Sequence, residues 1–272
     1  MNKKLLWAAG LMMTSLLINA QNGDNATMPK QFVKNIITNA DTSDWRGITL
    51  QHDKTNSAYY ATANGLQQVH VLLIVADPAQ QMKLLRAGME IWLNWKGKNN
   101  TNKATGIKYP LKSEEAFNPS EWQQNPQQGS SQIFKFMLSK KTEMQLTGFK
   151  KELNGKHNLV NSSGVKIAIN FTASNVMIYE LSVPYTALSE SVSFNTPVSL
   201  GIVFKAIEQS DFSGGGGRPP GAGGGRPGGG GRPPGVGGPP GGGSNSGSQQ
   251  RPDFEKMFKE TDIWYKFSLA EK

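Results

Sequence analysis

A segment rich in glycine, proline and arginine, residues 214–248, sets the strongest limit on how this chain of 272 residues can fold. More than half of the 31 glycines lie within it, and Gly-Gly-Arg-Pro-Pro-Gly occurs at 216–221 and again at 230–235. Because the segment has almost no apolar side chain to bury, we expect a flexible coil with partial polyproline-II character. Only 24 residues follow it, which is too few for a second domain.

The residues after this segment end in an alternating apolar pattern, Ile263, Tyr265, Phe267 and Leu269, which is typical of a strand with one buried face. We therefore predict that 214–248 is a long surface loop between two neighbouring strands of one sheet. Closing a loop costs only about 0.6 kcal/mol for each doubling of its length, so a fold tolerates such an insertion. The expected organisation is one domain, residues 21–272, interrupted by this loop.

The first 20 residues have the pattern of a signal peptide. Lys3 and Lys4 precede an apolar run from Leu5 to Ile18, and we expect cleavage after Ala20. Because the run is short for a bilayer span, we predict no integral membrane segment. An uncleaved membrane anchor is the alternative. The chain has no cysteine, so it has neither a disulfide nor a thiol for a lipid anchor. A periplasmic or secreted protein that is not a lipoprotein is the prediction.

The formal charge of +9 is spread unevenly along the chain. Two positive charges leave with the signal peptide, and four more belong to Arg218, Arg226, Arg232 and Arg251, in or beside the glycine-rich loop. The folded remainder carries about +3, which is too little for a nucleic-acid footprint. Weak attraction to anionic polysaccharide or lipid headgroups is compatible with this charge.

Most of the remaining chain reads as strands. Val69–Val75 is an apolar, β-branched run that suits a strand buried on both faces and closed by Asp77-Pro78. Alternating patterns predict further strands at 89–95, 167–171, 176–184 and 198–204, with 167–171 and 176–184 as an antiparallel hairpin. Helical signals are confined to Ser131–Lys141 and a turn at Tyr185–Glu190. The expected class is all-β, an antiparallel β-sandwich of immunoglobulin or jelly-roll type with one or two short helices.

No constellation for catalysis, metal binding or a cofactor is present in the sequence. His52, His70 and His157 lack partners at metal-ligand spacing, and His70, inside an apolar strand, is expected to be a hydrogen-bonded core residue. Glu90 and Glu180 lie within predicted strands, and facing carboxylates would suit glycoside hydrolysis. The simpler reading is that each points to solvent or meets a lysine, because glutamate is common on open sheet faces.

The tryptophans suggest a binding surface instead. Trp92 lies between Glu90 and Asn94 on the expected non-core face of its strand, and a flat ring beside polar groups suits sugar recognition. The alternative is that a helix or loop covers Trp92, since tryptophan is highly buried on average. Trp122, in a polar stretch, is the better candidate for an exposed loop, and Trp45 is a further candidate on composition alone.

Four stretches of the sequence form a recognisable set: Asn64–Asp77, Gly88–Asn94, Tyr179-Glu180-Leu181-Ser182-Val183-Pro184, and the closing run from Trp264 to Leu269. They resemble motifs of family 9 carbohydrate-binding-module-like domains. The resemblance implies a β-sandwich and glycan binding. Gly65, His70 and Asn94 depart from the residues usual in the family, and Asn94 replaces an acidic residue, which weakens the case for a calcium ligand at that strand end.

Three functions follow, in order of preference. The first is an exported, non-catalytic protein that binds a polysaccharide or oligosaccharide through Trp92, Trp122, Trp45, Glu90 and Asn94. The second is an envelope interaction or structural protein whose arginines in residues 214–248 dock on an acidic polymer or an envelope protein. A hydrolase ranks last because no nucleophile is identified.

Overall fold

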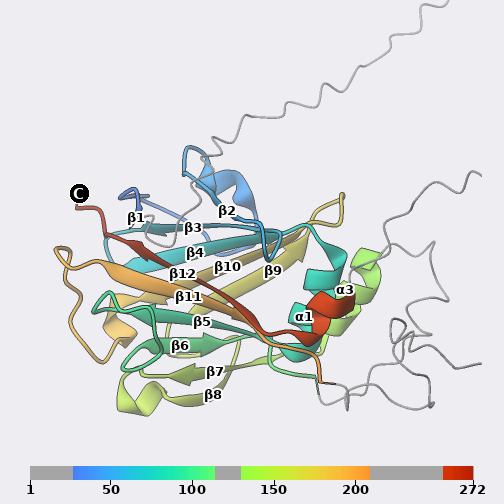
Figure 1. The fold of residues 1–272 in the computed structure, drawn as a ribbon. Coiled ribbons are helices and arrows are strands. Elements are labelled where there is room, and N and C mark those ends of the chain that lie inside the picture. Colours follow the sequence, from blue (N-terminus) through green and yellow to red (C-terminus); the bar gives the residue numbers. More distant parts are fainter. Residues whose placement is uncertain (1–26, 114–129, 209–253, 272) are drawn as a thin grey trace, which may run out of the picture.

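The computed structural model describes residues 27–113, 130–208 and 254–271, which form two facing β-sheets with helices packed at one end (Figure 1). The larger sheet has the order β1 (Thr27–Met28), β12 (Thr261–Phe267), β11 (Val198–Phe204), β5 (Met89–Asn94), β6 (Thr105–Lys108), β7 (Glu143–Thr147) and β8 (Gly155–Asn158). The smaller has the order β2 (Gln51–Asp53), β3 (Ala58–Asn64), β4 (Gln68–Val75), β10 (Met177–Pro184) and β9 (Lys166–Phe171). The predicted β-sandwich is confirmed.

Side chains alternate between the two faces of each strand, and those on the inner faces fill the space between the sheets. In β5, Met89, Ile91 and Leu93 belong to the main core, whereas Glu90 and Trp92 point away from it. All described strand pairs are antiparallel except β1 with β12, and the predicted hairpin appears as β9 paired with β10. The antiparallel pairing places Phe204 of β11 opposite Thr261 of β12, so the strands on either side of the glycine-rich segment are neighbours, as predicted.

The outward face of the five-stranded sheet is covered by the segment that precedes β2. Trp45, at the end of the 3-10 turn η1 (Thr42–Trp45), and Leu50 are buried in the main core cluster. This cover explains why β4 is buried on both faces, as its sequence indicated. The corresponding face of the seven-stranded sheet carries exposed or half-exposed side chains such as Asp262, Lys266 and Lys108. The sandwich therefore has one covered face and one open face.

Helix α3 (Ser130–Ser139) and the turn η3 (Tyr185–Ala187) lie where the sequence predicted helical structure. Further 3-10 turns are η2 (Lys151–Leu153) and η5 (Phe254–Phe258).

Helix α1 (Pro78–Ala87) is not among the elements that the sequence patterns predict, since Asp77-Pro78 indicates only the end of a strand. The same pair begins the helix: Pro78 stands in the first turn, and the Asp77 carboxylate accepts a hydrogen bond from the Ala79 N–H at 2.9 Å.

The helix buries polar residues that hide its pattern. Gln80, Gln81 and Lys83 are all buried in α1. The ammonium of Lys83 donates to the Lys259 carbonyl at 2.5 Å and to Thr261 Oγ1 at 3.2 Å. Burial lowers the pKa of Lys83 to about 8, although the nearby Glu260 carboxylate acts in the opposite direction. These contacts connect the helix to the beginning of β12.

His70 is buried in β4, as expected, but its Nδ1 finds no hydrogen-bond partner among the described residues. Burial lowers the pKa of His70 to about 4, since the charged imidazolium would lose its hydration. The folded protein therefore keeps this side chain neutral.

This burial predicts a loss of stability in acid. Between pH 6.5 and pH 4 the unfolded chain binds a proton at His70 that the folded chain does not, so the free energy of unfolding falls by about 3 kcal/mol. Above pH 6.5 the residue contributes no pH dependence. Urea unfolding of the wild type and of His70→Gln between pH 7 and pH 4 measures the difference. An equally steep loss in both proteins would contradict the assignment to His70.

Candidate functional site

Two tryptophans lie in one row across the open face of the seven-stranded sheet. The registers of four adjacent strands place Trp264 of β12, Gly201 of β11, Trp92 of β5 and Gly106 of β6 side by side. A second row, one step along the strands, contains Asp262, Val203, Glu90 and Lys108. A third row, on the other side of the tryptophans, contains Lys266, Ser199 and Asn94.

Each indole lies flat against a glycine of the next strand. A Cβ atom on Gly106 would come within 2.3–2.7 Å of three ring atoms of Trp92, and one on Gly201 within 2.5–2.6 Å of three ring atoms of Trp264. A glycine inside a strand weakens it unless another group must approach the backbone closely. Here the approaching groups are the two indoles, whose orientation depends on the absence of a side chain beneath them.

Each indole is also fixed by the acid two residues before it. Trp92 Nε1 donates to Glu90 Oε2 at 2.9 Å, and Trp264 Nε1 donates to Asp262 Oδ2 at 2.9 Å. The two strands thus share the pattern acid-Ile-Trp, at 90–92 and 262–264. This repetition is the sequence signal that could have identified Trp264 as a candidate site residue. The sequence patterns assign Trp264 only to the closing strand. We call Glu90, Trp92, Lys108, Asp262 and Trp264 the tryptophan face.

A lysine completes the surroundings of Glu90. Lys108 Nζ lies 2.8 Å from Glu90 Oε1, so both carboxylate oxygens have a partner. Partial burial acts to raise the pKa of Glu90, but the hydrogen bonds from Lys108 and Trp92 and the charge of Lys108 outweigh it and lower the pKa below its usual value. The tryptophan face therefore presents a charged carboxylate at neutral pH.

The two rings differ in accessibility. Trp92 is only 8% exposed and packs with Ala104, Val203 and Trp264 in a small apolar cluster separate from the main core. Trp264 is half-buried, and Asp262 beside it is exposed. Of the two, Trp264 is the ring that a ligand can reach, and Trp92 is chiefly a support that holds Glu90.

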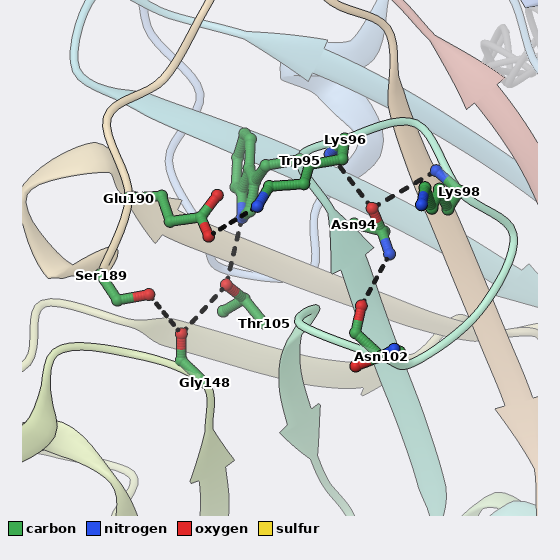
Figure 2. A network of polar contacts seen from close by, with 9 residues as sticks. All are labelled: Asn94, Trp95, Lys96, Lys98, Asn102, Thr105, Gly148, Ser189 and Glu190. Carbon is green, nitrogen blue, oxygen red and sulfur yellow. Dashed lines mark hydrogen bonds and ion pairs between the residues drawn. The ribbon is translucent and has the colours of Figure 1, made fainter.

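Asn94, a predicted ligand residue, builds a loop instead. Its Oδ1 accepts hydrogen bonds from the backbone N–H of Lys96 and Lys98 at 3.1 and 3.3 Å. Its amide nitrogen donates to the carbonyls of Asn100 and Asn102 at 3.1 and 3.2 Å, as Figure 2 shows for Asn102. Both ends of the side chain are committed to the turn between β5 and β6, so the predicted ligand role does not fit the structure.

Trp95, the residue after β5, does not join the tryptophan face, because its half-buried ring packs against the main core. Its Nε1 donates to Thr105 Oγ1 at 3.1 Å, and the hydroxyls of Thr105 and Ser189 both donate to the Gly148 carbonyl (Figure 2). The Trp95 ring meets Tyr185 edge to face, with centroids 6.4 Å apart. These contacts join the loops at one end of the sandwich.

Trp45 lies on the opposite side of the molecule. It is 2% exposed and donates from Nε1 to Glu180 Oε1 at 2.7 Å, while Glu180 Oε2 accepts from the backbone N–H of Asn39 and Ala40 at 2.8 and 2.7 Å. Burial raises the pKa of Glu180, and these three hydrogen bonds only partly offset it. A ring without a free face offers no stacking surface, so the predicted ligand role of Trp45 does not fit the structure.

The two glutamates considered for hydrolysis are far from being a pair. Glu90 points outward from the seven-stranded sheet and Glu180 outward from the five-stranded sheet, with the core between them. Carboxyl groups on opposite outer faces cannot flank one glycosidic bond.

Two further predictions concern residues outside the described ranges, Trp122 and the loop 214–248. Within the described ranges, no group of three or more His, Asp or Glu side chains is arranged to hold a metal ion. None of the helices there is long and apolar enough to cross a membrane.

The fold is similar to that of a family 9 carbohydrate-binding module from Caldicellulosiruptor kristjanssonii, solved in complex with cellotriose and with glucose. The matches cover 68% of this chain and 80% and 82% of the two chains, with 11% sequence identity and TM-scores of 0.35 and 0.36. No family model matches the sequence, and neither does any curated protein. The module belongs to the family that the sequence motifs resemble.

The contacts of Glu180 predict that Glu180→Gln destabilises the protein by about 2 kcal/mol. The amide replaces one acceptor oxygen by a donor, which would face either the Trp45 indole N–H or the backbone N–H groups of Asn39 and Ala40. Urea unfolding at neutral pH measures this loss, with the exposed Glu143→Gln as the matched control. Equal midpoints for both variants would show that other contacts hold the covering segment.

Proposed function

We propose that the protein is an exported, non-catalytic carbohydrate-binding protein whose ligand lies on the tryptophan face. The observation that carries the proposal is the half-buried Trp264 indole, laid flat on Gly201 and flanked by charged hydrogen-bonding groups on an open sheet face. Sugar rings have an apolar C–H face and a rim of hydroxyls, and they need this combination of flat aromatic and polar groups.

Each residue has a distinct role in this proposal. Trp264 stacks on a sugar ring, and Asp262 and Glu90 accept hydrogen bonds from hydroxyls. Lys108 donates to a hydroxyl while it keeps Glu90 charged. Trp92 acts through Glu90, since its N–H fixes one carboxylate oxygen. Because aromatic rings have fixed shapes and few rotatable bonds, little entropy is lost on binding.

The proposal predicts that Trp264→Ala weakens glycan binding by about tenfold or more, whereas Trp264→Phe retains part of the affinity. The ring is partly exposed on an outer face, so the thermal midpoint should change little. Isothermal titration with a panel of soluble oligosaccharides measures the affinity, and circular dichroism checks the fold. Binding that is unchanged in Trp264→Ala would place the ligand elsewhere.

The rival function, contacts through residues 214–248, is separated from this one by deleting that segment. If the tryptophan face binds the ligand, a variant lacking residues 214–248 keeps glycan binding and Trp264→Ala loses it. The opposite result would favour the loop as the binding element.

Export is the remaining part of the proposal. The pattern of residues 1–20 predicts that the mature chain begins at Gln21. Expression of the full chain in a bacterial host and mass spectrometry of the periplasmic and medium fractions measure the new N-terminus. An intact Met1 on membrane-bound material would indicate an uncleaved anchor instead.

A further inference from the structure

Charge is distributed asymmetrically around the tryptophan face. The row on one side of the tryptophans carries the acids Asp262 and Glu90, together with Lys108. The row on the other side carries Lys266 beside the neutral Ser199 and Asn94. A ligand on Trp264 therefore meets carboxylates in one direction along the strands and a lysine in the other.

Lys266 follows Trp264 by two residues on β12 and points to the same outward face, where it is exposed. Two residues along a strand correspond to about 7 Å, and the long, flexible Lys266 side chain extends the reach of its ammonium further. A substituent on the ring next to the one stacked on Trp264 is thus within reach of the Lys266 ammonium.

The turn between β5 and β6 brings two more lysines to this side. Asn94, in the same row as Lys266, holds the turn through its hydrogen bonds to residues 96–102 (Figure 2). Asn99 Oδ1 accepts a hydrogen bond from Ser199 Oγ at 2.5 Å, which attaches the turn to β11. Lys98 and Lys103 are exposed on this anchored turn. We call Lys98, Lys103 and Lys266 the lysine rim.

The lysines of the rim differ from other lysines near the tryptophan face in their pairing with acids. In the part of the chain that the structure describes, none of its three ammonium groups has a carboxylate within 4.0 Å. Their neighbour Lys96 differs, because its ammonium lies 3.2 Å from Glu190. By contrast, Lys108 and Lys205 on the acidic side are paired with Glu90 and Glu260. Among the residues that the structure describes, Lys98, Lys103 and Lys266 therefore offer a ligand positive charge that is not paired with an acid.

We propose that the ligand of the tryptophan face is an acidic glycan, in which a uronic acid next to the stacked ring places its carboxylate on the lysine rim. This inference rests on the proposed function and narrows its ligand class. Three exposed ammonium groups on one rim favour a polyanionic chain over a neutral one. Such attraction is screened by salt because all three lysines are exposed.

The test compares oligouronides with carboxyl-reduced counterparts of the same length and linkage. Galacturonides, mannuronides and glucuronides serve as probes for the mature full-length chain, and isothermal titration measures the affinity at low and at physiological ionic strength. We expect at least one acidic oligosaccharide to bind about tenfold more tightly than its neutral counterpart at low salt. That preference should decrease as salt is added.

Matched variants locate the effect. The triple variant Lys98→Gln, Lys103→Gln, Lys266→Gln should lose the preference for the acidic probe. The control variant Lys34→Gln, Lys54→Gln, Lys166→Gln removes the same charge from exposed positions elsewhere and should keep it. Equal loss in both triple variants would show that net charge, rather than the lysine rim, causes the preference, and would overturn the inference.

The remaining outcomes separate this inference from the proposed function. Equal affinity for acidic and neutral counterparts, with binding still dependent on Trp264, would overturn the acidic ligand and leave carbohydrate binding in place. Absence of binding to every acidic and neutral probe would overturn both.

Discussion

The pairing of β11 with β12 is the constraint on which the candidate site depends. It joins β12, the last strand, to a sheet whose other described strands all come earlier in the chain. It also places Gly201 beneath the Trp264 ring. Because β11 also pairs with β5, the same strand aligns the two acid-Ile-Trp patterns in one row. Lys83 adds a second attachment, since its buried ammonium binds the chain at the start of β12. A shift of β12 by one residue would turn Trp264 into the core and expose Ile263 and Tyr265.

The two outer faces show how the same residue type takes opposite roles. Glu180 and Glu90 both point outward from central strands, but the segment before β2 covers Glu180 and supplies three N–H donors, whereas Glu90 stays partly exposed between Lys108 and Trp92. Burial dominates at Glu180 and raises its pKa, and the neighbouring cation and donors dominate at Glu90 and lower its pKa. One carboxylate therefore attaches a covering layer, and the other remains available at the surface.

Local patterns sufficed to predict the class of fold, the hairpin β9–β10, and β11 and β12 as neighbours on either side of the glycine-rich segment, because alternation and turn residues are encoded locally. They also placed Trp92 on the outward face. The pattern does not predict helix α1, because its buried Gln80, Gln81 and Lys83 break the apolar period. The hydrogen bonds of the Lys83 ammonium come from tertiary partners. The burial of Trp45 and the proximity of Trp264 to Trp92 depend on contacts between segments more than 100 residues apart in sequence, which no local pattern contains.

The position of β12 in its sheet has a consequence for cooperativity. Among the described strands, β1, two residues long, is the one that lies outside β12, so the described part of the sheet gives this strand a full-length neighbour on one side alone. Strands near a sheet edge are among the first to open in local fluctuations, and such an opening would remove Trp264 and Lys266 together while Trp92 and Glu90 stayed in place. A ligand that contacts both β12 and β5 would hold these two strands together across the intervening β11. Ligand binding and the pairing of β12 with the sheet would then be thermodynamically linked.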